Sequence, residues 1–142
     1  MSTGSRTIER LHHGAIRMLR AMRGVDEAGG FSGPRASAMS VLVFAGPQSL
    51  GELAAAEGVK PPTMSRLVKA LQAEGLVEVE AGGDQRSIRI CASPKGRNLL
   101  LKARDRRLAA LARMLASATP AERAAMDKVA ALLERSFSKP SE

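Results

Sequence analysis

The 142-residue sequence is poor in aromatic residues: it has no tryptophan, no tyrosine and three phenylalanines. Proteins that bind single-stranded DNA or RNA stack bases on aromatic side chains, so this composition argues against that class of binding. Cysteine is scarcer still, because Cys91 stands alone and a disulfide within the chain is excluded. A single thiol also agrees with the reducing environment of the cytoplasm.

Long apolar segments are missing as well. The longest, Ala38 to Ala45, is interrupted by Ser40 and is far too short to cross a bilayer. The residues from Met1 to Ser5 are polar and lack the apolar centre of a signal peptide. We therefore expect a cytoplasmic protein with no membrane partner.

The sequence also lacks the residue sets that carry catalysis. Its two histidines, His12 and His13, form no cluster with Cys91 or acids at the spacing of metal ligands. No nucleophile–base pair is recognisable, and Gly82-Gly83 lies between two strand patterns rather than in front of a helix, as a phosphate-binding loop would. We expect no enzymatic activity, no cofactor and no metal.

Positive charge, by contrast, is abundant. The chain has 22 Lys and Arg against 14 Asp and Glu, a formal charge of +8, and a pI near 10.8. Such an excess favours a polyanionic partner, since each neutralised phosphate releases a counterion. A soluble basic protein without a polyanionic partner would have the same charge, so the motifs must decide between these two interpretations. The length suits one domain with a real core.

Two helix patterns joined by a tight turn lie between Ser49 and Gly75. Ser49-Leu50-Gly51-Glu52 has the sequence pattern of a capping box, in which the serine hydroxyl accepts a hydrogen bond from an N–H of the first turn. The second helix begins at Lys60-Pro61-Pro62 and ends at Gly75, because proline suits a first turn and glycine the position after the last. Two short helices around a glycine-containing turn predict a helix-turn-helix.

A β-hairpin pattern follows this helix pair. Val77 and Val79 alternate with acidic residues, and Ile88 and Ile90 alternate with polar ones after a turn at 81–85. Outside these elements, the sequence predicts helices at 6–23, from 34 to about 45, from 94 to about 116 and from 120 to 137, with a loop at 24–33. The fold class is therefore mainly α with a small β-hairpin wing (α+β).

The terminal helices carry apolar stripes that the small central lobe has little surface to cover. The stripes contain Ile8, Leu11, Ala15, Met18, Leu19 and Met22; Leu101, Leu108, Leu111 and Leu115; and Met126, Val129, Leu133 and Phe137. We infer that a second copy covers them and that the protein is a homodimer. The whole chain, 1–142, then forms one domain, with dimerisation helices at 6–27 and 95–138 and a winged helix-turn-helix lobe at 34–93.

Over about residues 34–101 the chain resembles the MarR family of winged helix-turn-helix transcriptional regulators. The matching motifs, in chain order, are Leu50-Gly51-Glu52-Leu53-Ala54, Pro62-Thr63-Met64-Ser65-Arg66-Leu67-Val68, Leu71-x-x-x-Gly75-Leu76-Val77, Asp84-x-Arg86 and Ser93-Pro94-Lys95-Gly96. The resemblance implies a homodimer that binds a near-palindromic operator in double-stranded DNA, usually as a repressor. It also implies release of the DNA when a small anionic or phenolic effector, or an oxidant, acts between the dimer and DNA-binding lobes.

The predicted DNA contacts on the second helix of the pair are Lys60, Thr63, Ser65, Arg66 and Lys69. We assign Arg66 and Thr63 to base edges, because arginine can bond two acceptors of guanine and the threonine methyl can meet thymine. Ser65 and Lys69 are assigned to phosphates, which set register without reading sequence. Family members commonly have Ser and then Arg or Lys before the Pro-Thr pair, whereas Lys60 and Pro61 stand here, so the basic side chain moves to the N-cap.

The wing tip carries the remaining predicted contacts, Asp84 and Arg86. Arg86 is assigned to the minor groove, whose negative potential attracts arginine, and Asp84 would hold it in position. The alternative is a surface ion pair of little energetic consequence. Gly82-Gly83 replaces the more usual proline-containing turn of the family.

Three further residues could take part in regulation. His12 borders the first stripe and is a candidate for an effector pocket or, alternatively, a helix-flank histidine at the dimer contact. Arg104 and Arg97 lie within the leucine stripe; they either extend out of it or one faces an acid or an anionic ligand, and Arg104 is the better pocket candidate. Cys91 is interpreted as an inert thiol, since oxidant-sensing relatives have their cysteine in the first helix.

These features predict a sequence-specific DNA-binding transcriptional regulator, a homodimeric repressor released by a small-molecule effector. Two alternatives are a winged-helix module for protein–protein contacts and a nonspecific DNA-packaging protein. An interaction module would not need Arg66, Lys69 and Arg86, and a packaging protein would bind random duplex as well as its own promoter region.

Overall fold

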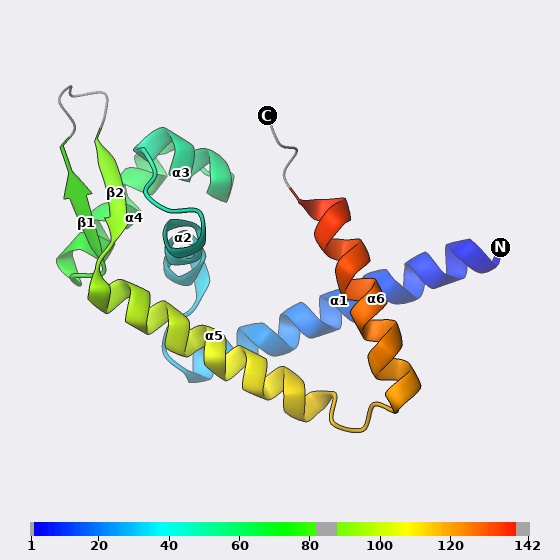
Figure 1. Ribbon diagram of the computed structural model, residues 1–142. Coiled ribbons are helices and arrows are strands. Elements are labelled where there is room, and N and C mark those ends of the chain that lie inside the picture. The colour runs from blue at the N-terminus through cyan, green and yellow to red at the C-terminus, as the bar shows by residue number, and fades with distance from the viewer. Residues whose placement is uncertain (1, 82–87, 139–142) are drawn as a thin grey trace. The chain divides into compact units, whose positions relative to one another are not determined.

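The computed structural model describes residues 2–81 and 88–138 (Figure 1). Its elements are α1 (Thr3–Ala28), α2 (Gly33–Phe44), α3 (Leu50–Glu57), α4 (Pro61–Ala73), β1 (Val77–Glu80), β2 (Arg89–Ala92), α5 (Pro94–Met114) and α6 (Pro120–Phe137). Six helices and one two-stranded antiparallel sheet confirm the predicted fold class. The chain divides into two compact units, 1–110 and 111–142, and each is described by itself.

The helix-turn-helix forms as its capping signals predict. The Ser49 hydroxyl accepts the N–H of Glu52 at 3.1 Å and so caps α3, while Gly58 ends the helix in the left-handed region at φ 65°. Lys60 is the N-cap of α4, with two prolines in the first turn. Gly75, at φ 73°, follows the C-cap of α4 and allows the chain to turn into β1.

One apolar core holds α2, α3, α4 and the hairpin together. In Figure 1 these elements gather at one end of α5, and contacts join α3 to α4, α4 to β1 and α2 to β2. The largest fully buried side chains are Phe31, Met39, Leu53, Met64, Leu71, Leu76, Ile90 and Leu100. They come from α2, α3, α4, β2 and α5 and from the residues just before α2 and β1, so one shared core packs these elements together.

The wing is tied to the helix-turn-helix by more than its own strands. Val77 pairs with Ala92 and Glu80 with Arg89 in the antiparallel ladder. Gln48, just before α3, adds an isolated bridge to Ile90, with hydrogen bonds of 3.1 and 2.7 Å in the two directions. β2 therefore has β1 on one side and Gln48 on the other, and it is held against the start of α3.

The alternating apolar pattern of the hairpin is buried only near its base. Val77 and Ile90 belong to the core, but Val79 and Ile88 are 41% and 44% exposed. The predicted apolar face of the hairpin is thus covered at its base and accessible toward the tip. Of the predicted turn at 81–85, residues 82–85 lie outside the described residues.

The predicted loop at 24–33 is wrong in its first half, since α1 continues to Ala28. A single glycine weakens a helix but keeps its N–H and C=O available, so Gly24 does not end it. The end comes at Gly29, whose N–H bonds to the carbonyl of Val25 at 3.0 Å, and at Gly30, which has φ 75°.

The face of α5 that enters the core also differs from the predicted stripe. The buried residues are Gly96, Leu100, Ala103 and Ala110, whereas Leu108 and Leu115 of the predicted stripe are exposed. Two faces of this helix are therefore apolar: one packs on the lobe, and the leucine stripe remains accessible in the single chain.

The unit from 111 to 142 contains α6 with both halves of a capping box. The Thr119 hydroxyl accepts the N–H of Glu122 at 3.1 Å, and the Glu122 carboxylate accepts the N–H of Thr119 at 3.2 Å. None of the residues of α6, all of which the structure describes, is buried. Across 2–81 and 88–138, no helix is both long and apolar enough to span a bilayer.

Candidate nucleic-acid interface

Helix α4 has one buried face and one exposed polar face. Met64, Val68 and Leu71 are buried in the core. Arg66 and Lys69, three positions apart and therefore neighbours on the helix surface, lie on the opposite side and are exposed. The helix consequently presents a pair of cations on the side that the lobe leaves open.

Two predicted contact residues flank this cation pair. Thr63 is exposed on one side of it, and Ser65 is half-buried on the other. Lys60 precedes the helix as its exposed N-cap, and its side chain makes no capping hydrogen bond. Of the seven predicted DNA contacts, Asp84 and Arg86 lie outside the described residues.

A groove of about 570 Å³ runs beside α4 toward the wing. Its polar lining includes Ser49, Ser65, Lys69 and Gln72, and its apolar lining includes Leu50, Val79 and Ile88. The half-exposed valine and isoleucine of the hairpin therefore form one wall of this groove, and the polar flank of α4 forms another. The sequence pattern did not predict the groove, because the alternation of Val79 and Ile88 does not show which side chains face them.

The comparison with protein families identifies this lobe. Residues 29–87 match the model of the MarR family, a span that contains α2, α3, α4 and β1. Over these residues the chain is similar to the MarR family.

Relatives and solved structures extend the likeness over nearly the whole chain. An HTH-type transcriptional regulator of Mycobacterium bovis is 29% identical over 141 residues, which cover 96% of this chain and 99% of the relative. The structure of a MarR family protein from Bacillus stearothermophilus superposes with a TM-score of 0.82 at 22% identity, covering 98% of this chain and 99% of that one. The chain therefore has the fold of this MarR family protein, and the relative that it matches over nearly its whole length is an HTH-type transcriptional regulator.

A further structure of the same fold contains a bound small molecule. It is the organohalide-sensing transcriptional regulator RdhR in its 2,4-dichlorophenol-bound form, with a TM-score of 0.64 at 18% identity, and it covers 96% of this chain and 82% of that one. At this identity the likeness shows the shared fold.

The two residues predicted for an effector pocket lie on different helices, His12 on α1 and Arg104 on α5. His12 and Arg104 are both exposed. Arg97, the other arginine of the leucine stripe, is exposed too, which agrees with the interpretation that these side chains extend out of the stripe. Their assignment to a pocket stays a prediction.

Two other arginines of α5, which the sequence pattern did not single out, point inward instead. Arg107 Nε lies 3.4 Å from the Asp26 carboxylate, whose side chain is 17% exposed. Arg106 packs so closely on Gly29 that a Cβ there would lie 2.5 Å from its Nε. Each of these three charged side chains has at least one buried nitrogen or oxygen without a hydrogen-bond partner in the described chain, an unusual condition for charged groups.

Surface hollows adjoin this charged cluster. One of about 370 Å³ is lined by Met22, Asp26, Ser32 and Arg107, among others, and one of about 230 Å³ by Asp26, Ser37, Ser40 and Arg107. The arginine and aspartate are therefore reachable from both sides, with serine hydroxyls nearby. No periodicity in the sequence links Arg107 of α5 to Asp26 of α1, so the pattern alone could not have found this site.

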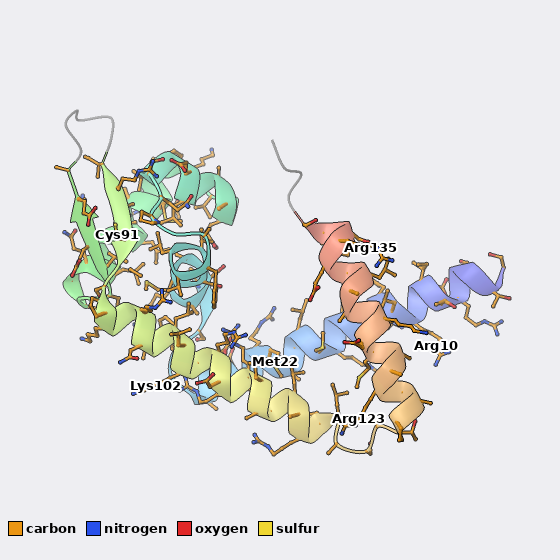
Figure 2. All side chains as sticks on the ribbon, viewed as in Figure 1. Arg10, Met22, Cys91, Lys102, Arg123 and Arg135 are labelled. Atoms are coloured by element: carbon orange, nitrogen blue, oxygen red, sulfur yellow. The ribbon has the colours of Figure 1, made fainter. Side chains whose placement is uncertain are left out.

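Cys91 lies on β2, half-buried (Figure 2). Partial burial raises the pKa of its thiol, and the Glu80 and Glu78 carboxylates raise it further, while Arg89 acts weakly in the opposite direction. A raised pKa lowers the fraction of reactive thiolate at neutral pH. In residues 2–81 and 88–138, no three His, Cys, Asp or Glu side chains are grouped to hold a metal ion.

Proposed function

We propose that this protein is a homodimeric repressor that binds a near-palindromic operator and places α4 in the major groove of duplex DNA. The observation that carries this proposal is the exposed face of α4, where Arg66 and Lys69 stand opposite a fully packed face. A helix held this way can enter a groove about 12 Å wide without exposing its core side chains.

The groove beside α4 supports the division between base and phosphate contacts. When a helix occupies the major groove of DNA and a wing reaches the adjacent minor groove, the DNA backbone that separates these two grooves passes between the helix and the wing. Ser65 and Lys69 line the protein groove between α4 and the wing, which favours their assignment to phosphates. Arg66 and Thr63 lie outside this lining and remain the base-reading candidates, and Arg86 remains the candidate for the minor groove.

The homodimer is supported by apolar side chains that stay accessible in the single chain. In α1 these include Ile8, Leu11 and Leu19, and in α6 they include Met126, Val129 and Leu132. Accessible apolar stripes on regular helices are typical of surfaces that bury against another chain. A twofold dimer would set two copies of α4 against half-sites separated by one duplex turn, ~34 Å.

The distribution of charge favours specific reading over nonspecific packaging. Residues 34–93, which hold the proposed DNA-binding lobe, contain six Lys or Arg and six Asp or Glu. A protein that packages any duplex through this lobe would gain most of its affinity from an excess of cations there. The lobe has no such excess of positive charge. Its cations must therefore contribute through where they are placed, as Arg66 and Lys69 do on the exposed face of α4.

Binding to DNA is tested by footprinting the wild-type protein on the DNA that flanks its own gene, with Arg66→Ala and Arg86→Ala beside it. We expect protection by the wild type and a loss of about 10- to 100-fold in affinity for Arg66→Ala, as for the removal of a bidentate base contact. Unchanged protection in both variants would overturn the residue assignment. Equal binding to random duplex would favour packaging, and no binding at all would favour a protein-interaction module.

The effector belongs to the same proposal, and the structure offers a more specific place for it than His12 and Arg104. A small anionic or phenolic compound in the hollows at Asp26 and Arg107 would offer oxygen atoms to the Arg107 guanidinium, which lines both hollows. Thermal-shift measurements with salicylate on the wild type, Arg104→Ala and Arg107→Ala distinguish the two positions. A shift lost only in Arg107→Ala would place the compound at the charged cluster, and equal shifts in all three would remove both residues from the pocket.

A further inference from the structure

The carboxyl end of α4 is held by side chains from two other helices. Glu74 is the C-cap of α4. Arg35, near the start of α2, donates two hydrogen bonds to its carboxylate, and Lys95, near the start of α5, donates one to its main-chain carbonyl. We name these three residues the Glu74 clamp.

The geometry of the clamp is specific. Arg35 Nε lies 3.0 Å from Glu74 Oε2 while its Nη2 bonds to Oε1, so the guanidinium binds the carboxylate with two parallel bonds. The same guanidinium carbon lies 5.5 Å from the ring centroid of Phe31, a fully buried core residue. Lys95 Nζ lies 2.9 Å from the Glu74 carbonyl oxygen. The end of α4 is thus fixed to α2 and α5 by directional contacts.

An acidic residue is a poor choice for this position unless it has another role. The carboxyl end of a helix carries partial negative charge, so a carboxylate there is unfavourable. The side chains of Arg35 and Glu74 are 35% and 44% exposed, and an ion pair as exposed as this adds little to folding stability. Stability therefore explains neither the acid nor the pair, whereas control of the helix direction explains both.

We propose that Arg35 is a positioning residue for DNA recognition: through Glu74 it fixes the direction of α4, and it does not itself touch the DNA. This inference rests on the proposed reading of duplex DNA by α4. Side chains at a recognition site must be held within about 0.5 Å and 10–20° of the binding geometry. The clamp is at the opposite end of α4 from Thr63, so a change of tilt at Glu74 displaces the side chains that meet the bases.

Glu74→Gln separates this role from simple electrostatics, because the two explanations predict opposite results. If Glu74 only repelled phosphates, its neutralisation would strengthen binding to any duplex. If Glu74 positions α4, the near-isosteric glutamine loses the charged bidentate pair and the preference for the correct sequence falls. We expect the ratio of specific to random-duplex affinity to drop about tenfold.

The experiment uses the full-length protein and a duplex enriched from a random-sequence library by the wild type. Affinities for this duplex and for a scrambled version are measured for the wild type, Arg35→Ala, Glu74→Gln and the double variant. Each single variant should lose about tenfold in the ratio, and the double variant should lose no more, because both residues act through one contact. The melting temperature should change by only a few degrees.

Matched controls carry the same charge changes elsewhere. Arg123→Ala and Glu134→Gln alter exposed residues of α6 and should keep the wild-type ratio. An unchanged or increased ratio in Glu74→Gln, or additive losses in the double variant, would overturn the role of the clamp alone. A wild-type protein that enriches no sequence would overturn the proposed function and the clamp with it.

Discussion

The lobe from α2 to β2 and the terminal helices α1 and α6 follow opposite rules of burial. Every element of the lobe contributes a buried side chain to one core, and Met39, Leu53, Met64 and Leu71 are completely covered. The terminal helices contain no buried residue over their full described lengths, although their apolar side chains are just as regular. A helical stripe therefore shows that a surface must be covered, but not which chain covers it.

Charge separates the two regions in the same way. Residues 34–93 hold equal numbers of cationic and acidic side chains, so the net charge of +8 resides entirely in the segments that flank them. A high net charge is thus a property of the flanking helices, whereas the proposed DNA contacts depend on a few placed cations. This difference indicates that packing within the chain determines the structure of the lobe. The flanking helices instead present surfaces that are available for association with another chain.

The largest expected effect comes from breaking the association of the terminal helices. Val129 and Leu132 of α6 are 38% and 43% exposed and lie one turn apart. Replacing both by glutamate would bury two charges at the proposed dimer contact, at a cost that the interface cannot recover. We expect the mass in solution to halve and operator affinity to fall at least 100-fold, because the two lobes no longer bind together.

The matched control places the same two charges on the opposite side of the same helix. Ala124 and Ala131 are exposed there, and Ala124→Glu with Ala131→Glu should keep the dimer mass. Light scattering after size exclusion distinguishes the variants. A dimer that survives the change at Val129 and Leu132, or is lost equally in the control, would show that α6 does not use its apolar face for association.

Within the lobe, the strongest test of packing is Gly96 at the start of α5. A Cβ at this position would lie 2.1 Å from the carbonyl oxygen of Leu76 and 2.7 Å from Met39 Cε. Backbone cannot yield as a flexible side chain can, so Gly96→Ala should destabilise the lobe by about 1–3 kcal/mol or more. Denaturant unfolding followed by circular dichroism measures this loss, and a variant as stable as the wild type would contradict the close approach of α5 to β1.

Local signals in the sequence predicted most of the lobe because each rests on neighbouring residues. The cap at Ser49 and the stop at Gly75 are short-range hydrogen-bond and dihedral effects, and the structure confirms both. The same locality made the family motifs recognisable. The buried face of α4 followed in turn, since Met64, Val68 and Leu71 keep helical spacing.

What the sequence could not predict depends on distant partners. Arg35 and Glu74 are 39 positions apart, and no periodicity links an arginine of one helix to the end of another. For α5, two apolar faces compete, and only the lobe decides that Leu100 packs while Leu108 does not. The contact of Arg107 with Asp26 of α1 could not be predicted either, because the two residues are far apart in the sequence.

A smaller effect of opposite sign is expected in α1. Gly24 lies inside this helix with no atom within 4 Å of a Cβ built there. Since alanine is favoured over glycine in an exposed helix interior, Gly24→Ala should stabilise the protein by roughly 0.5–1 kcal/mol. The opposite signs expected for Gly24→Ala and Gly96→Ala distinguish an uncovered helix from a packed one. Thermal unfolding measures the stability change of both variants. Destabilisation by Gly24→Ala would indicate that this side of α1 is covered in the dimer.

The smallest effect concerns the reactivity of Cys91 in the lobe. Partial burial and the Glu80 and Glu78 carboxylates raise the pKa of its thiol, so the thiol stays protonated at neutral pH and thiolate forms only as the pH rises through that raised value. Iodoacetamide should therefore alkylate Cys91 more slowly than a cysteine in a short peptide at pH 7–8, with the rate rising toward higher pH. Glu80→Gln removes one charge and one hydrogen-bond acceptor, which lowers the pKa and should increase the rate a few-fold, while Glu134→Gln should not. Faster alkylation of the wild type than of the peptide would contradict the raised pKa of the Cys91 thiol.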